Sequence, residues 1–234
     1  SRSFATSIAT PKKIVIRRLL QPAGGASWKC SQVQLPQERM NMFEDMKWLN
    51  EPPRFEIGAD RLTLETAPAT DFWRETHYGF TRDSGHFLHR EVDGDFDVTA
   101  TVSGDFTSLY DQAGLMIRCD EETWLKAGVE FSDGALQLST VITNGTSDWS
   151  LSPLEAGRDK ITLRLTRQDN AVHVQYLKHP GLAGQQWTSL RLGYLQLNGP
   201  CQVGVMACSP ERGDLHVGFT DFSIHPSAGI NLHS

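Results

Sequence analysis

Short runs of β-branched, leucine and aromatic residues fill the chain from residue 54 onward. A Gly, Asp, Asn or Pro interrupts them about every 8–12 residues, which is typical of an all-β sandwich or barrel. We expect strands at 54–58, 61–66, 85–92, 96–104, 112–119, 123–131, 135–143, 160–167, 171–177, 188–195, 202–207 and 215–225. No long amphipathic helix and no internal repeat is visible. The sequence therefore predicts an all-β fold.

Turn signals between these runs indicate how the strands pair. Asp133-Gly134 and Asn144-Gly145 supply the positive φ angles that tight hairpins need. The strands flanking them are therefore expected to be antiparallel neighbours. Residues 42–53 could form a short helical turn that ends at two prolines. We assign residues 40–228 to one sandwich domain, 1–39 to a basic N-terminal extension and 229–234 to a C-terminal tail.

Residues 112–131 carry the clearest alternation. With side chains pointing to opposite faces in turn, one face is apolar: Ala113, Leu115, Ile117, Leu125, Ala127, Val129 and Phe131. The other face is mixed: Gln112, Gly114, Met116, Arg118, Trp124, Lys126, Gly128 and Glu130. A polar face is often only the solvated side of an antiparallel sheet. Alternatively, Trp124 could stack on a sugar ring while its polar neighbours bond hydroxyls, with the two glycines leaving space.

Charge and composition exclude several classes. The chain has 234 residues, 39% of them hydrophobic, and a net charge of −6. This acidic balance does not favour nucleic acid, and no apolar run is long enough to predict a membrane span. The four cysteines form no CxxC pair. We expect reduced thiols in an intracellular protein, with a Cys201–Cys208 bridge as the alternative.

Residues 1–39 differ from the rest of the chain. They carry seven basic residues and one acidic residue, and they are rich in Ser, Ala and Arg, as mitochondrial transit peptides are. A leader irrelevant to the fold and a functional tail are the other interpretations, and Met40 and Met42 are plausible starts. The expected location is cytoplasmic, or mitochondrial if this segment is a transit peptide.

Three other groups of residues are candidate sites. Residues 91–95 partly resemble the paired-acid motif of sandwich endoglucanases, but Phe96 stands where the second glutamate belongs, so a solvated hairpin is favoured. Three histidines lie at 77, 86 and 89, but His86 and His89 are three apart on an expected strand and face opposite sides, so no metal site and no cofactor are predicted. The aromatic segment 71–80 is either an exposed recognition loop or a cap on the core.

Several long segments together carry a family resemblance. They are DFWRETHYGF (71–80), SGHFLHREVDGDF (84–96), YDQAGLMIRCDEETWLKAGVEF (110–131), STVITNGTSDWS (139–150) and QVGVMACSP with GFTDFSIHP (202–226). They resemble the concanavalin A-like lectin/glucanase superfamily, in particular the domain-of-unknown-function family catalogued as "regulation of enolase protein". The resemblance covers residues 42–226 and implies a two-sheet antiparallel, jelly-roll-like sandwich with a carbohydrate site on its concave sheet face.

The resemblance brings no agreed reaction. The ligand-binding candidates, from the resemblance and the alternation together, are Trp73, Thr76, Tyr78, His86, Gln112, Arg118, Trp124, Lys126, Glu130 and Thr143. We expect a carbohydrate or sugar-phosphate ligand, with Lys126 and Arg118 binding an anionic group. One alternative is a glycoside hydrolase or lyase that uses Glu130 with Asp111 or Asp148. Another is a protein-interaction regulator of a carbohydrate-metabolism enzyme such as enolase.

Overall fold

The computed structural model describes residues 42–155, 157, 160–177 and 186–232. The extension expected over residues 1–39, the first two residues of the expected domain and the last two residues of the expected tail lie outside this part of the chain. So does Cys30. Within the described residues, no helix is long and apolar enough to cross a membrane.

Sixteen strands form in the described part of the chain, and twelve of them match expected strands to within one or two residues at each end. The strands are β1 (Lys47–Leu49), β2 (Arg54–Ile57), β3 (Arg61–Glu65), β4 (Phe72–Arg74), β5 (Thr81–Asp83), β6 (His86–Val92), β7 (Phe96–Gly104), β8 (Gln112–Arg118), β9 (Thr123–Ser132), β10 (Ala135–Asn144), β11 (Thr146–Pro153), β12 (Lys160–Gln168), β13 (Ala171–Leu177), β14 (Trp187–Tyr194), β15 (Cys201–Cys208) and β16 (His216–Pro226).

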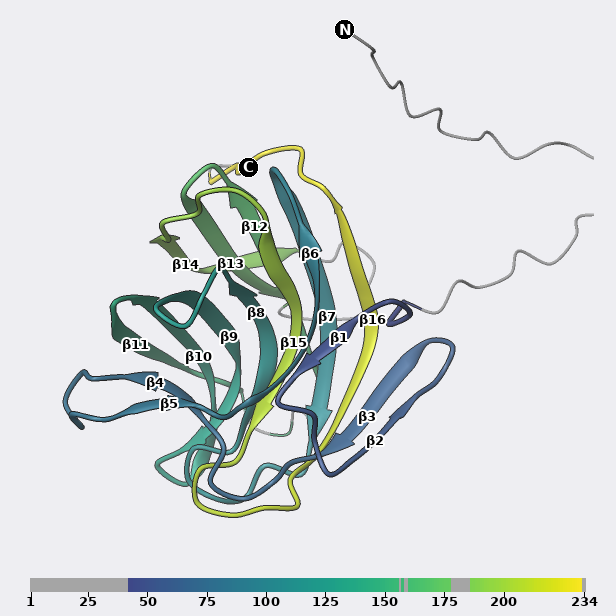
Figure 1. The fold of residues 1–234 in the computed structure, drawn as a ribbon, viewed down its shortest axis with the longest axis vertical. Coiled ribbons are helices and arrows are strands. Elements are labelled where there is room, and N and C mark those ends of the chain that lie inside the picture. Colours follow the sequence, from purple (N-terminus) through teal and green to yellow (C-terminus); the bar gives the residue numbers. More distant parts are fainter. Residues whose placement is uncertain (1–41, 156, 158–159, 178–185, 233–234) are drawn as a thin grey trace, which may run out of the picture. The chain divides into compact units, whose positions relative to one another are not determined.

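Two large sheets make up the body of the domain (Figure 1). The first sheet has the order β1-β6-β15-β8-β9-β10-β11, and the second has the order β14-β13-β12-β7-β16-β3-β2. All pairings in both sheets are antiparallel. The expected two-sheet antiparallel sandwich is therefore confirmed.

The core lies between the two sheets, where the alternation placed it. Leu115 on β8, Leu125 on β9 and Val205 on β15 pack in one cluster with Val98 on β7 and Leu163 on β12. Ala113, Ile117, Ala127 and Val129 belong to the same cluster. Because successive side chains alternate between faces, Gln112, Met116, Lys126 and Glu130 point away from the second sheet, toward the outer face of the first.

The turn between β9 and β10 shows why the local sequence predicts the pairing. Asp133 and Gly134 have φ angles of 54° and 77°, and Ser132 pairs with Ala135 across them. Two residues with positive φ match the twist of the flanking strands. The expected neighbours β8, β9 and β10 are hydrogen-bonded in that order.

Four strands were missed by the sequence analysis. Residues 42–53 do not make the expected helical turn: after a turn at 42–45, β1 pairs with β6. β4 and β5 pair only with each other, and β11 follows β10 through Gly145. β1, β4 and β5 have three residues each, which is too short for a periodic pattern, and β11 is mostly Ser, Thr and Asp, which have little strand preference apart from Thr.

The expected reduced state of the cysteines holds for the three that are described: Cys119, Cys201 and Cys208 are free thiols. The alternative Cys201–Cys208 bridge does not form. The two residues are the first and last of β15, and an eight-residue strand at about 3.3 Å per residue separates their Cα atoms by far more than the roughly 7 Å limit for a disulfide.

Candidate functional site

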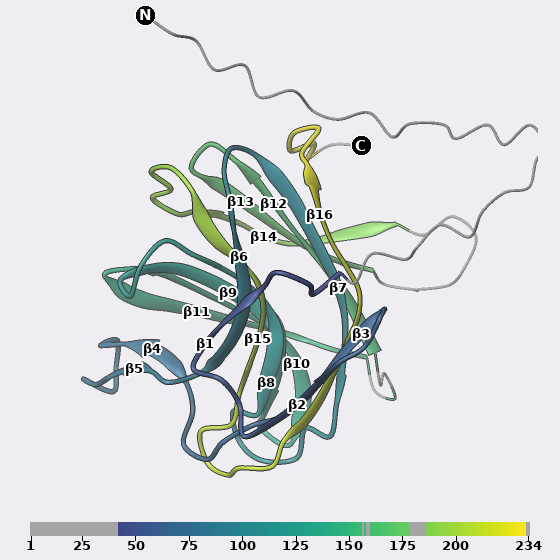
Figure 2. The same cartoon turned by 45° about the vertical axis from the view of Figure 1, so that its right-hand side comes forward.

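The β4–β5 hairpin creates the site by covering part of the outer face of the first sheet. Figures 1 and 2 show the hairpin on the side of the first sheet where β11 lies, and β4 contacts β11. The ammonium of Lys126 donates to the carbonyl of Phe72 at 2.7 Å. Arg118 pairs with Asp83 through two hydrogen bonds of 2.9 Å. Arg74 donates through its backbone N–H to the hydroxyl of Ser147 at 2.9 Å. These contacts hold the hairpin against strands β8 to β11.

A second apolar cluster fills the space under the hairpin. Its members are Phe72, Trp73, Phe87, Met116, Trp124, Val141, Met206 and Cys208. The Trp124 ring lies 6.2 Å from the Phe72 ring, its indole N–H donates to the Glu121 carbonyl, and the residue is 1% exposed. The stacking role expected for Trp124 is therefore incompatible with its position. The alternating pattern along the strands of the sheet gives no sign of the hairpin that buries Trp124.

A pocket of about 160 Å³ opens beside this cluster. We call it the outer-face pocket. Its lining residues are Asp71, Trp73, Tyr78, Phe80, Tyr110, Gln112, Lys126, Glu130, Val141, Trp149, Pro210 and Glu211. The hairpin segment, β8, β9, β10 and β11 all contribute to it. Five of the expected ligand-binding residues line it: Trp73, Tyr78, Gln112, Lys126 and Glu130.

Lys126 and Asp71 form a buried ion pair at the floor of the pocket. The Lys126 Nζ lies 3.1 Å from Asp71 Oδ1. The same oxygen accepts from the backbone N–H of Phe72 at 2.8 Å and from the amide of Gln112 at 3.4 Å. Burial lowers the pKa of Lys126, but the attraction of Asp71, with smaller contributions from Cys208 and Glu130, outweighs burial and raises the pKa above its usual value. Lys126 is therefore a cation whose charge is already balanced by the Asp71 carboxylate.

Glu130 is the second buried acid of the floor. It is the cross-strand neighbour of Gln112 and only 3% exposed. Burial raises the pKa of Glu130, while the Ser139 hydroxyl, the charge of Lys126 and a hydrogen bond with Trp149 offset part of that rise. A carboxyl that keeps its proton more readily than usual can donate a hydrogen bond as well as accept one. A perturbed acid in a pocket is also a common mark of a functional site.

Aromatic side chains form the rim of the pocket. Tyr78 is 45% exposed and Trp149 39%. Tyr78 stacks on Phe80 with 5.4 Å between ring centroids, and its hydroxyl lies 2.9 Å from that of Tyr110. This hydrogen bond, followed by burial, raises the pKa of Tyr110 to about 12. The rim thus combines exposed aromatic rings with the exposed residue Glu211.

The aromatic segment 71–80, expected to be either an exposed recognition loop or a cap on the core, is partly buried and partly exposed. Phe72 and Trp73 are buried under the hairpin, whereas Tyr78 and Phe80 are exposed at the rim. The segment caps the second cluster with one part and borders the pocket with the other. Thr76, expected to bind ligand, contributes its carbonyl to the Trp73 indole N–H at 3.0 Å and does not line the pocket.

His86 has a structural role that accounts for its presence. Its Nε2 accepts from the backbone N–H of Ala67 at 2.9 Å, and its Nδ1 lies 2.6 Å from the carbonyl of Asn50. Burial lowers the pKa of His86, so the neutral ring fits both bonds. Neither His86 nor Arg118, which Asp83 holds, lines the pocket. Thr143 is also fully buried and shares a hydrogen bond with Ser147.

The two acids proposed as partners of Glu130 lie elsewhere. Asp111 accepts hydrogen bonds from the backbone of Thr107 and Ser108, from the Ser209 hydroxyl and from Arg212. Burial raises its pKa, but these donors outweigh burial and the net shift is downward. It therefore holds loops together. Asp148 is exposed and pairs with Arg191 at 2.9 Å; alternation along β11 turns it away from the pocket that Trp149 lines.

Sequence reasoning missed several lining residues. Asp71 and Phe80 belong to the aromatic segment 71–80, and Trp149 is next to Asp148, which we had considered as a catalytic acid. The sequence therefore pointed to the neighbourhood of these three residues. Pro210 and Glu211, in contrast, follow β15 and reach the pocket only through the packing of loops. The carboxylate that accompanies Glu130 in the pocket floor is thus Asp71.

The two glycines of the outer face also need reinterpretation. Gly114 and Gly128 lie opposite each other in β8 and β9. A Cβ added to Gly114 would lie 2.1 Å from the Ala127 carbonyl oxygen, and one added to Gly128 would lie 2.0 Å from the Ala113 oxygen. The close approach of the two backbones therefore requires glycine here, rather than space for a ligand.

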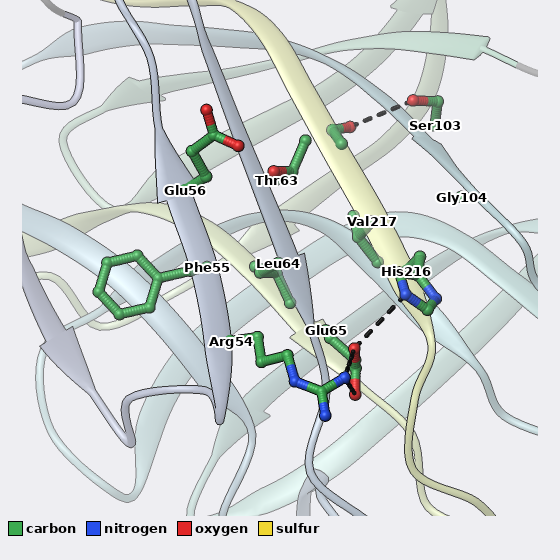
Figure 3. Close-up of a pocket in the computed structure, with 11 residues that line it drawn as sticks. Arg54, Phe55, Glu56, Thr63, Leu64, Glu65, Ser103, Gly104, His216 and Val217 are labelled. Atoms are coloured by element: carbon green, nitrogen blue, oxygen red, sulfur yellow. Dashed lines mark hydrogen bonds and ion pairs between the residues drawn. The ribbon is translucent and has the colours of Figure 1, made fainter.

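A larger depression of about 520 Å³ lies over β2, β3 and β16 (Figure 3). Within it, Glu65 lies 2.8 Å from Arg54 and 3.4 Å from His216. Arg54 is largely exposed, so water screens this charge. Because this depression holds no buried ionisable side chain, the outer-face pocket is the stronger candidate site. No group of three or more His, Cys, Asp or Glu residues in the described ranges is arranged to hold a metal ion.

Comparisons with known proteins identify the family of this chain and structures with a similar fold. Residues 48–227 match the family described as "Protein of unknown function (DUF1349)". A relative from Saccharomyces cerevisiae, named "Regulation of enolase protein 1", is 45% identical over 186 residues, covering 80% of this chain and 92% of that protein. A crystal structure of a functionally unknown protein from Saccharomyces cerevisiae is 43% identical, covers 80% of this chain and 99% of its own, and has a TM-score of 0.76.

One distant solved structure shows the wider fold. The legume lectin-like domain from Entamoeba histolytica has a TM-score of 0.53 at 8% identity, covering 80% of this chain and 92% of that one. At this identity the likeness extends to the architecture of the sandwich alone.

Proposed function

Because the chain belongs to the DUF1349 family, whose description assigns no function, and has a lectin-like sandwich, we propose from its site that it binds a carbohydrate ring in the outer-face pocket. The observation that carries this proposal is the combination of an aromatic rim with a buried, hydrogen-bonding floor. Sugar rings have an apolar face, which Tyr78 or Trp149 would cover, and a hydroxyl edge, which Glu130 and Gln112 would bond.

The size of the pocket limits what fits. Pockets for drug-sized ligands usually measure about 300–1,000 Å³, whereas this one measures about 160 Å³. A single ring, either a monosaccharide or the terminal residue of a longer glycan, suits it better than an oligosaccharide enclosed along its length.

Charge balance favours a neutral sugar over a sugar phosphate. Lys126, the only cation among the residues lining the pocket, is paired with Asp71. Arg118, the other expected phosphate ligand, is held by both oxygens of Asp83. Binding a phosphate would require one of these partly buried pairs to break, which is costly. Neutral hydroxyls require no such change.

The test is calorimetric titration of the full chain with monosaccharides, sugar phosphates and short oligosaccharides. Trp149→Ala, which removes an exposed rim ring, should weaken binding of the sugar that the wild type takes by at least tenfold. Phe55→Ala is the matched control, because Phe55 is also exposed but lines only the other depression. Binding that Trp149→Ala leaves unchanged, or that Phe55→Ala weakens equally, contradicts the proposal.

A second candidate function, cleavage of a glycosidic bond, is supported by the two acids of the floor. Glu130 holds its proton more readily than usual, as a general acid must, and Asp71 replaces Asp111 and Asp148 as the acid that accompanies it. Product release measured with aryl glycosides of the bound sugar is the test. Glu130→Gln should then abolish turnover while binding persists. If the wild type shows no turnover, binding is the only function of the pocket that this proposal retains.

A regulatory contact with a metabolic enzyme is the third candidate, and the name of the yeast relative favours it. Tyr78 and Phe80 are exposed on the hairpin segment and could contact a protein as well as a sugar. Co-sedimentation of this chain with purified enolase tests the candidate directly. If a complex forms and Trp149→Ala leaves it intact, the contact lies outside the pocket.

A further inference from the structure

Two cysteines lie opposite each other at the end of the first sheet farthest from the outer-face pocket. Cys119 follows β8, and Cys201 begins β15. The register of this antiparallel pair runs to Arg118 opposite Gln202, and one more residue along the same register would set Cys119 opposite Cys201. Directly opposed residues have Cα atoms about 4.5–5.5 Å apart, which lies within the roughly 4.4–6.8 Å that a disulfide requires. The β8–β15 register thus brings the two cysteines to the same end of neighbouring strands, at a spacing that a disulfide could bridge.

The two thiols contact each other and differ in exposure. Their side chains are close enough for a hydrogen bond that shifts the pKa of both, and both are free. The Cys119 thiol also donates to the Gln196 carbonyl at 4.0 Å, and the Cys201 thiol to the Gly199 carbonyl at 3.7 Å. Cys119 is partly accessible to solvent, whereas Cys201 is buried. A small oxidant can therefore reach one sulfur, with the other directly behind it.

A buried arginine completes the cluster. Arg167 Nη1 lies 3.0 Å from Cys201 Sγ and 3.1 Å from the carbonyl of Gly199. Its other bonds go to the carbonyls of Leu197 and Asp169. All these partners are neutral in the thiol form of Cys201, although burying a cation strongly favours a nearby anion. A thiolate in this pair supplies that anion.

The two thiols differ in how readily they ionise. The hydrogen bond from Cys201, helped by Arg167, lowers the pKa of Cys119 despite burial and the nearby Asp120. The same hydrogen bond, together with burial, raises the pKa of Cys201. Cys119 is thus the sulfur that ionises more readily, and Cys201 is the one that keeps its proton. Partly exposed thiolates beside a second thiol are the cysteines that peroxides oxidise selectively.

We propose that Cys119 and Cys201 are a reversible oxidation site, at which a hydroperoxide converts the two thiols into a disulfide. The Cys119 thiolate attacks the peroxide oxygen, which forms a sulfenic acid and releases hydroxide or alkoxide. The Cys201 sulfur then attacks the sulfenic sulfur, and the hydroxyl leaves as water with the Cys201 proton. For hydrogen peroxide, two thiols and one peroxide give one disulfide and two waters. Arg167 stabilises negative charge on Cys201 during the second step.

The test uses the full chain treated with hydrogen peroxide, alkylated and digested with trypsin. Cleavage after Arg118 and Lys126 isolates Cys119 in the peptide 119–126, and cleavage after Arg191 and Arg212 places Cys201 and Cys208 together in the peptide 192–212. The expected product is one disulfide joining these two peptides, reversed by dithiothreitol. The matched control is Cys208→Ser, which removes the other cysteine of the second peptide and should leave the product unchanged.

Two further variants separate the roles. Cys201→Ser should stop at a Cys119 sulfenic acid, trapped by dimedone, and Cys119→Ser should slow oxidation of Cys201 by at least tenfold. The proposal is overturned if both thiols of the native wild type stay reduced. It is also overturned if Cys119 instead pairs with Cys30, or if the disulfide forms only in urea. The wild-type mapping decides between these outcomes even if a variant fails to fold.

Discussion

Replacing Lys126 by methionine tests whether its ion pair organises the outer-face pocket. The variant keeps the length and apolar stem of the side chain but leaves the Asp71 carboxylate without its cation and the Phe72 carbonyl without its donor. Removing one partner of a buried pair costs about 3–5 kcal/mol. Because the Asp71 side chain keeps 18% of its surface in water, we expect the lower end, about 3 kcal/mol. In a domain of this size, that corresponds to a fall in Tm of about 6–12 °C.

The assay is urea unfolding of a double-mutant cycle formed by Lys126→Met, Asp71→Asn and the double variant. If the ion pair is the cause, the double variant should be less destabilised than the sum of the single variants, by about 1–3 kcal/mol. Lys47→Met, at an exposed site, is the matched control and should change stability by no more than about 0.5 kcal/mol. A Lys126→Met cost that is the same in both Asp71 backgrounds refutes the reasoning.

Three further predictions concern single residues. Burial raises the pKa of Glu130 above its ordinary value of 4.5. The stability that the protonated Glu130 contributes is therefore lost as the pH rises through the pKa of the folded state. In thermal scans, Glu130→Gln should lose less stability than the wild type between pH 4 and pH 8. His86→Ala should cost about 1–3 kcal/mol, because it leaves two backbone groups unpaired. Burial lowers the pKa of His86, so the fall in wild-type stability below about pH 6.5 should be shallower in the variant; an unchanged profile contradicts the assignment. Gly114→Ala should cost about 3 kcal/mol or more in urea unfolding, since its Cβ would meet the β9 backbone. Gly94→Ala meets no atom and should cost only the roughly 1–2 kcal/mol of placing alanine at a positive φ of 73°.

The Cys119–Cys201 pair and the outer-face pocket could not be assigned from sequence for the same reason. Cys119 and Cys201 lie 82 residues apart in the chain, and only the β8–β15 register brings them together. Asp71 lies 55 residues from Lys126. Spacing in the sequence carries no information about such pairs, because the contact depends on which strands become neighbours and where a hairpin folds back.

The sequence by itself determined the elements and the core of this protein. Period-2 alternation placed Leu125, Ala127 and Val129 in the core, and Asp133-Gly134 predicted the β9–β10 hairpin. These are local properties: side chains alternate along any strand, and two residues with positive φ close a tight turn wherever they occur. Tyr78, Gln112, Lys126 and Glu130, which we expected to bind ligand, all line the outer-face pocket.

Tertiary structure alone decided which side of the sheet is solvated. Alternation places Trp124 and Lys126 on the face opposite the core, but it cannot show that a hairpin of three-residue strands covers that face. The cover turns Trp124 from a stacking surface into a packed core residue and brings Asp71 to Lys126. It leaves Trp149, from a strand with little apolar pattern, as the exposed ring. Burial depends on contacts between distant segments, and those contacts set the chemistry of the site.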